Sequence, residues 1–137
     1  MKKELLILLI MIFTLSGCAK KTPVTGNVIS ITPSEIVSNF DNKEDFFLVV
    51  SLTTCPLCAE YKLGLAELVK NYQVDVYVIE IDLYEEDFDL LSENYLDILT
   101  DAPDSFLIKE GNIVFEKTGF IQYRNLVNIL KEHGFVK

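Results

Sequence analysis

The feature of this sequence that most restricts its fold is an apolar strand that leads directly into a helix. Residues 46–52, FFLVVSL, are almost continuously apolar and have the length of a strand that is covered on both faces. The apolar residues that follow are spaced by three or four positions, as on one face of an amphipathic helix: Leu57, Tyr61, Leu65, Leu68 and Tyr72. Two cysteines, in the segment Cys55-Pro56-Leu57-Cys58, lie where the strand ends and the helix begins.

The rest of the chain continues this alternation and predicts an α/β fold with the order βαβαβαββα. Thr32-Pro33-Ser34-Glu35 is a capping box with proline in the first turn of a helix. Glu110-Gly111-Asn112 has the chemistry of a hairpin turn, and Gly134 should end the last helix. The expected strands are 28–31, 46–52, 74–82, 105–109 and 113–117, and the expected helices are 33–40, 57–72, 88–98 and 123–132. We therefore expect a central mixed sheet of parallel strands with a C-terminal antiparallel hairpin, flanked by helices.

The first 17 residues have the pattern of a signal peptide. Lys2 and Lys3 precede an unbroken apolar stretch at 5–13, and small residues follow at 16 and 17. As a helix, residues 5–15 would reach about 17 Å, well short of the ~30 Å of a bilayer's hydrocarbon core. We therefore expect this segment to be removed rather than to span a membrane permanently.

Leu15-Ser16-Gly17-Cys18 resembles the bacterial lipobox. The resemblance implies that the Cys18 sulfur carries a diacylglyceryl group and that cleavage makes Cys18 the new N-terminus. An ordinary secretory signal with an additional cysteine is the alternative. We therefore expect a signal peptide at 1–17, a lipid-anchored tether at 18–27 and a folded domain at 28–137, held on the extracytoplasmic side of a bacterial cell membrane.

The charge of the mature chain restricts its partners. Without residues 1–17, ten basic and twenty acidic residues remain, a net charge of −10. This balance argues against binding nucleic acid and against direct binding of the domain to anionic lipid. The membrane contact should therefore be made by the lipid on Cys18. About 120 residues are enough for one domain with its own core, and we expect a monomer.

The position of the cysteine pair indicates redox chemistry. Unpaired N–H groups and the dipole at a helix N-terminus stabilise an anion, so a cysteine there has a lowered pKa and forms a nucleophilic thiolate. Cys55 should attack a substrate and Cys58, one helical turn later, should resolve the mixed disulfide. This dithiol needs no cofactor. A structural disulfide, inert buried thiols and a Cu(I) clip remain alternatives; zinc usually requires four N or S ligands, and the only histidine is His133.

The chain also resembles the thioredoxin superfamily over roughly residues 28–135. The matching features are the strand–CxxC–helix unit, Ala102-Pro103 located 45 residues after Cys58, and the hairpin FLIKEGNIVFEKTGF before the last helix. The resemblance implies that Pro103 is cis and lies beside the cysteines, and that the backbone of Ala102 binds the substrate peptide. Thr54, Pro56 and Leu57 would also contact substrate. Among superfamily members, the sequence looks closest to thioredoxin-like and bacteriocin-accessory-like exported proteins.

Two positions depart from the superfamily pattern. Thioredoxins have a buried acid six residues before the first cysteine, where this chain has Val49. Thr54 stands at the usual tryptophan, and the chain contains no Trp. The acid assists proton transfer during resolution, so its loss predicts slower resolution or assistance by water.

The segment from Glu80 to Asp104 contains ten acidic residues and no Lys or Arg. We interpret it as a solvated face; selection of basic partner surfaces is the alternative. It does not match an EF-hand loop, because Asp87 stands where glycine is required.

The sequence therefore predicts a membrane-anchored thiol–disulfide oxidoreductase. Its partners would be exported proteins with thiols or disulfides and a second protein that recycles the pair; the direction of electron flow is left open. The second hypothesis is a non-catalytic binding lipoprotein in which the same pair is a structural disulfide.

Overall fold

A computed structural model of the chain describes residues 25–97 and 101–137. The predicted signal peptide, Cys18 and most of the predicted tether therefore lie outside the described residues. The elements are β1 (Val28–Ser30), α2 (Pro33–Asp41), β2 (Phe46–Ser51), α3 (Pro56–Tyr72), β3 (Val76–Glu80), the 3₁₀ turn η2 (Ile81–Leu83), α4 (Glu85–Asn94), β4 (Asp104–Lys109), β5 (Asn112–Thr118) and α5 (Tyr123–Glu132). This order confirms the predicted alternation of strands and helices.

The five strands form one mixed sheet in the order β1-β3-β2-β4-β5. β1 and β2 both pair parallel with β3, whereas β4 is antiparallel to β2 and to β5. The β4–β5 hairpin turns at Glu110 and Gly111, which both have positive φ. The predicted combination of parallel strands and a C-terminal antiparallel hairpin is confirmed.

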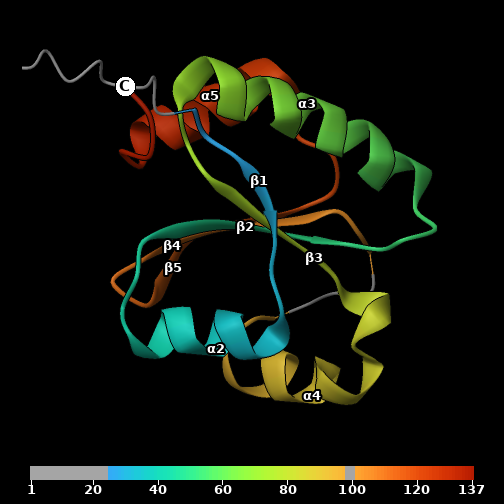
Figure 1. Cartoon of the computed structure of the whole chain (residues 1–137). Helices are drawn as coiled ribbons and strands as arrows, with labels where there is room; N and C mark the ends of the chain where they lie inside the picture. The colour runs from blue at the N-terminus through green and yellow to red at the C-terminus, as the bar shows by residue number, and fades with distance from the viewer. Residues whose placement is uncertain (1–24, 98–100) are drawn as a thin grey trace, which may run out of the picture.

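Helices cover both faces of the sheet, with α3 and α5 on one side and α2 and α4 on the other (Figure 1). All six residues of β2 are buried, as expected for a central strand with helices on both faces. Its side chains alternate between two cores: Phe47 and Val49 join the core under α3 and α5, and Leu48 and Val50 join the core under α2 and α4.

Local sequence signals account for several element ends. The Thr32 side chain accepts a hydrogen bond from the backbone N–H of Glu35, and the Glu35 carboxylate accepts one from the N–H of Thr32, so the predicted capping box is present. The β3 segment is shorter than predicted because the chain enters η2 at Ile81. Helix α4 begins at Glu85, earlier than predicted, with three acidic residues in its first turn.

Two features of the helical prediction around α4 fall outside the described residues, namely Ile98 and the side chain of Phe88. Among residues 25–97 and 101–137, no helix combines the length and the apolar character needed to cross a bilayer.

Candidate active site

The cysteine pair lies at the end of the sheet where the parallel strands finish. β2 ends at Ser51, and a turn closed by a hydrogen bond from the Cys55 N–H to the Leu52 carbonyl (3.4 Å) leads into α3. Cys55 is the N-cap residue of α3 and Pro56 occupies the first turn, where a missing N–H leaves no hydrogen bond unmade. The sequence predicted this strand–turn–helix unit.

Cys55 and Cys58 are joined by a disulfide, with their Cα atoms 5.2 Å apart. Cys58 is buried, with 1% of its surface exposed, and Cys55 is partly exposed. The backbone N–H of Cys58 donates to the Cys55 sulfur at 3.0 Å. The partly exposed cysteine is therefore the one whose sulfur accepts a hydrogen bond from an N–H group of the helix N-terminus.

The Ala102–Pro103 segment lies beside this pair. Its peptide bond is cis, as the resemblance implied, and the Ala102 carbonyl oxygen is 3.7 Å from the Cys55 sulfur. Pro103 is buried, and its carbonyl accepts a hydrogen bond from the Gly119 N–H at 2.8 Å. This bond ties the loop before β4 to the end of β5, so the position of Ala102 against Cys55 is set by the hairpin.

Comparison with solved structures gives the same architecture. Thioredoxin O1 from Arabidopsis thaliana in its oxidised state superposes with a TM-score of 0.63 at 19% identity, over 82% of this chain and 100% of that chain. The oxidised thioredoxin of Plasmodium falciparum gives a TM-score of 0.61 at 19% identity, over 78% of this chain and 98% of that one. A thioredoxin variant from Halobacterium salinarum gives a TM-score of 0.60 at 16% identity, over 85% of this chain and 95% of that one. This chain has the thioredoxin fold. No family model and no curated protein matches its sequence.

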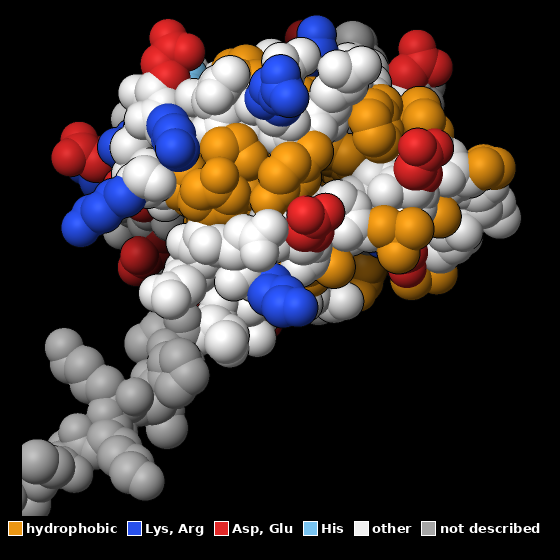
Figure 2. Space-filling model, turned by 90° about the horizontal axis from the view of Figure 1, so that it is seen from above, with side chains coloured by type: hydrophobic (Ala, Val, Ile, Leu, Met, Phe, Trp, Pro, Cys, Tyr) orange, Lys and Arg blue, Asp and Glu red, His pale blue; other side chains and the backbone are white. Residues whose placement is uncertain are grey.

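The residues next to Cys55 in the sequence of this thioredoxin fold are exposed. Thr54, Pro56 and Leu57 are all exposed, Leu57 to 43%. Phe120, which follows Gly119, is 37% exposed, and its ring packs against Tyr61 with centroids 5.4 Å apart. Figure 2 shows apolar side chains grouped on the side of the molecule that carries α3 and α5, with charged side chains scattered around them. The residues expected to contact substrate therefore lie next to Cys55 on open surface.

A hydroxyl pair lies near the position where thioredoxins have the buried acid. Val49 is opposite Ser105 in the β2–β4 ladder, and the Ser105 hydroxyl is 3.0 Å from that of Tyr61, one turn after Cys58 in α3. Tyr61 and Ser105 are both buried. Burial raises the pKa of Tyr61 to about 12, while the bond to Ser105 acts in the opposite direction. At physiological pH the Tyr61 hydroxyl therefore keeps its proton.

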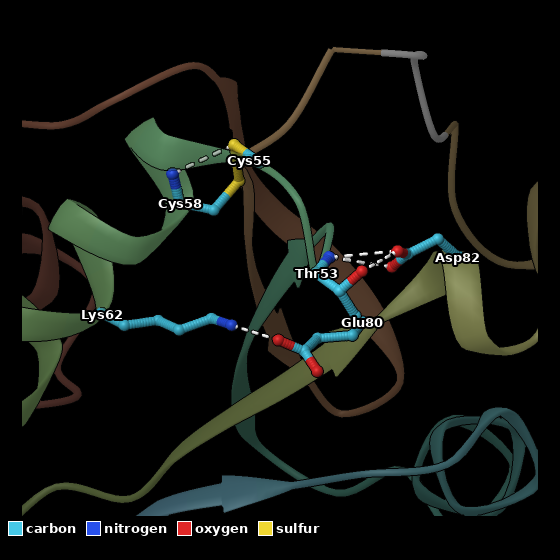
Figure 3. A network of polar contacts seen from close by, with 6 residues as sticks. All are labelled: Thr53, Cys55, Cys58, Lys62, Glu80 and Asp82. Carbon is cyan, nitrogen blue, oxygen red and sulfur yellow. Dashed lines mark hydrogen bonds and ion pairs between the residues drawn. A yellow bond between two sulfur atoms is a disulfide. The ribbon is translucent and has the colours of Figure 1, made fainter.

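Sequence reasoning missed a charged network on the other side of the cysteine turn (Figure 3). The Asp82 carboxylate accepts hydrogen bonds from the backbone N–H and the hydroxyl of Thr53. Lys62, in the second turn of α3, forms an ion pair with Glu80 at the end of β3. The hydroxyl of Thr53 is the main cause that lowers the pKa of Asp82, and the Lys62 ammonium adds a smaller effect in the same direction.

The acidic stretch is only in part the solvated face that the sequence predicts. Seven of its carboxylates are exposed: Glu85, Glu86, Asp87, Asp89, Glu93, Asp97 and Asp101. The prediction is wrong for Asp104, which is buried in the first position of β4, because the strand enters the sheet there. Glu80 and Asp82 are partly buried and bind Lys62 and Thr53.

In the described part of the chain, no three His, Cys, Asp or Glu side chains are grouped so that they could hold a metal ion. His133 caps the end of α5, and its ring packs against that of Phe115.

Proposed function

We propose that this protein is a thiol–disulfide oxidoreductase that acts on protein substrates, with Cys55 as the nucleophile and Cys58 as the resolving residue. The asymmetry of the pair carries the proposal. The Cys55 sulfur is partly exposed and receives the Cys58 N–H, whereas Cys58 is buried. A thiolate on Cys55 would keep this hydrogen bond and would gain from the helix N-terminus, which lowers its pKa.

In the reducing direction, the Cys55 thiolate attacks one sulfur of a substrate disulfide. A mixed disulfide forms, and the other substrate sulfur leaves as a thiolate, which takes a proton. Cys58 then loses its proton and attacks the Cys55 sulfur. The Cys55–Cys58 disulfide forms, and the second substrate thiolate leaves. Two electrons pass from the dithiol to the substrate, and the oxidising direction is the exact reverse.

Ala102 and Pro103 supply the place where a substrate backbone would dock. The Ala102 carbonyl points toward Cys55 at 3.7 Å, and the Gly119 N–H holds the loop through the Pro103 carbonyl. A substrate strand that bonds to the backbone of Ala102 would bring its own cysteine to the Cys55 sulfur. Thr54, Pro56 and Leu57 would line the other side of that strand.

The same proposal includes anchoring through a lipid on Cys18, with the domain on the extracytoplasmic side of a bacterial membrane. The first described residues support a suitable orientation. The Asn27 N–H binds the Asp75 carboxylate just before β1 and β3 begin, whereas Cys55 follows the end of the parallel strand β2. The chain therefore enters β1 at the end of the sheet opposite the cysteines, so in an anchored protein the cysteines would face away from the membrane.

Exchange with a protein disulfide tests this function. The reduced domain should reduce the disulfides of insulin, or the oxidised domain should oxidise a reduced unfolded protein, and Cys55→Ser should abolish both reactions. The reduction potential of the Cys55–Cys58 pair then indicates the favoured direction. A folded domain whose disulfide exchanges with neither substrate would instead be the binding lipoprotein with a structural disulfide.

A further inference from the structure

The geometry points to Asp82 as a positioning residue that fixes Cys55 when the disulfide is open. The inference rests on the proposed function, because it concerns the same cysteine pair. Asp82 contacts the turn that precedes Cys55 and touches neither sulfur. It lies in η2, directly after β3, whereas the turn that it holds follows β2.

Three hydrogen bonds connect Asp82 to one residue of the turn. The N–H of Thr53 lies 3.0 Å from Oδ1 and 3.1 Å from Oδ2, and the Thr53 hydroxyl donates to Oδ2. Asp82 is ionised at neutral pH, and its bonds to Thr53 are the main cause that lowers its pKa further. Bonds to a charged acceptor are stronger than those between neutral groups. Figure 3 shows the Asp82 carboxylate turned toward Thr53, on the side of the turn away from Lys62.

The turn has a second anchor that depends on the redox state. In the oxidised protein the disulfide joins Cys55 to Cys58, which is buried in α3. Reduction removes this cross-link, and exposed Thr54 and Pro56 then flank a free Cys55. The bonds from Thr53 to Asp82 do not involve sulfur and persist. They therefore limit the movement of Cys55 in the dithiol and in the mixed disulfide. In these two states the bond between the cysteines is open, and the Cys58 sulfur must come within reach of the Cys55 sulfur for it to form.

Restricting Cys55 in the reduced state raises the effective concentration of one sulfur near the other. Loss of Asp82 should therefore make the Cys55–Cys58 disulfide easier to reduce. Loss of its negative charge would also favour a Cys55 thiolate, which acts in the same direction, so the experiment needs a control for charge.

The test measures the equilibrium between the Cys55–Cys58 disulfide and glutathione in the whole folded domain, by trapping free thiols. Asp82→Ala should lower the equilibrium constant for disulfide formation by roughly 3- to 30-fold, the range expected for a charge-assisted hydrogen-bonded anchor. Thr53→Val, which removes the hydroxyl and keeps the N–H bonds and the carboxylate, should give a smaller shift of the same sign.

Two matched variants separate positioning from charge and from general destabilisation. Glu80→Gln removes one negative charge from the same network but leaves the turn's bonds intact. Asp45→Ala removes a carboxylate that accepts a backbone N–H, that of Glu110, at the other end of β2. Both should stay within about twofold of the wild-type equilibrium constant, although Asp45→Ala should lower the melting temperature as Asp82→Ala does.

A shift for Asp82→Ala no larger than that of Glu80→Gln or Asp45→Ala would overturn the positioning role. If Asp82→Ala does not fold, Thr53→Val decides: an unchanged equilibrium constant rejects the inference. The rate of exchange of the wild-type domain with a protein disulfide tests the proposed function separately. The equilibrium with glutathione reports on Asp82 even where that rate is zero.

Discussion

The backbone N–H of Cys58 points at the sulfur of Cys55 from 3.0 Å, within the first turn of α3. In the reduced pair this N–H would stabilise a thiolate on Cys55, which is the basis of the different roles proposed for the two sulfurs. Cys55 is the partly exposed cysteine, and it is also the one whose thiolate would accept this hydrogen bond.

This relationship predicts the outcome of replacing each cysteine. Cys58→Ser should allow Cys55 to form mixed disulfides that persist, because no second thiol remains to release them. Non-reducing gels of cell extracts should show high-mass adducts that disappear on reduction. Cys55→Ser serves as the matched control and should give none, because its remaining thiol is buried. Adducts with Cys55→Ser and none with Cys58→Ser would reverse the assigned roles.

The proposed anchor predicts a separate behaviour for the third cysteine. Cys18→Ser should move the protein from the detergent phase to the aqueous phase in phase separation, because no sulfur is left to carry the lipid. The folded domain should keep its exchange activity. Ala19→Ser changes the neighbouring residue and should leave partitioning as in the wild type. A Cys18→Ser protein that stays in the membrane fraction would indicate a retained apolar helix instead.

The hydroxyl pair of Tyr61 and Ser105 predicts a stability effect. Tyr61→Phe should lower the free energy of unfolding by about 1–3 kcal/mol, because the Ser105 hydroxyl would remain buried without its partner. Urea unfolding measures this loss. In the double variant with Ser105→Ala, part of the loss should be recovered, since neither hydroxyl is then left without a partner. A double variant that is as unstable as the sum of the single ones would contradict a coupled pair.

The same tyrosine predicts a dependence on alkaline pH. Its pKa rises from 10.0 to about 12 in the fold because it is buried, so the folded state holds the proton more tightly than the unfolded state. The resulting stabilisation is fully present below pH 10 and is lost as the pH rises toward 12. The stability difference between the wild type and Tyr61→Phe should therefore shrink between about pH 10 and about pH 12. A constant difference would mean that Tyr61 does not titrate differently in the two states.

Much of the fold followed from local sequence signals. The apolar run of β2, the helical spacing after Cys58 and the capping box at Thr32 each determine structure through nearby residues, and each was predicted. The contact between Ala102 and Cys55 is long-range, and it was expected only from the resemblance to thioredoxins.

The contacts of the charged network and the hydroxyl pair could not be predicted in this way. Thr53 and Asp82 are 29 residues apart, and Tyr61 and Ser105 are 44 apart, so no periodic pattern connects them. In the sequence, Asp82 is one of ten carboxylates in an acidic stretch, and Tyr61 is one of five residues on the apolar face of a helix. Thr53 and Asp82 meet because each follows the end of one of two neighbouring strands, β2 and β3. Tyr61 and Ser105 meet because one face of α3 contacts β4. Both contacts depend on the register of the sheet.

The residue that departs most from the thioredoxin pattern gives the last prediction. Val49 is 1% exposed and packs in the core beneath α3. Val49→Asp would restore an acid at that position, and burial should raise its pKa because the charged form is poorly solvated there. Since the folded state then favours the protonated form, the loss of stability should be smallest below about pH 4 and should grow as the pH rises through the raised pKa. At neutral pH it should reach about 3 kcal/mol or more.

Release of a mixed disulfide by the Val49→Asp variant should nevertheless become faster, because a nearby carboxylate can take the Cys58 proton. Val50→Asp is the matched control: Val50 is equally buried in the same strand but faces the core under α2 and α4. It should destabilise the domain in the same way without speeding release. Equal release rates for the two variants, measured by single-turnover kinetics, would show that resolution in this protein does not depend on an acid at position 49.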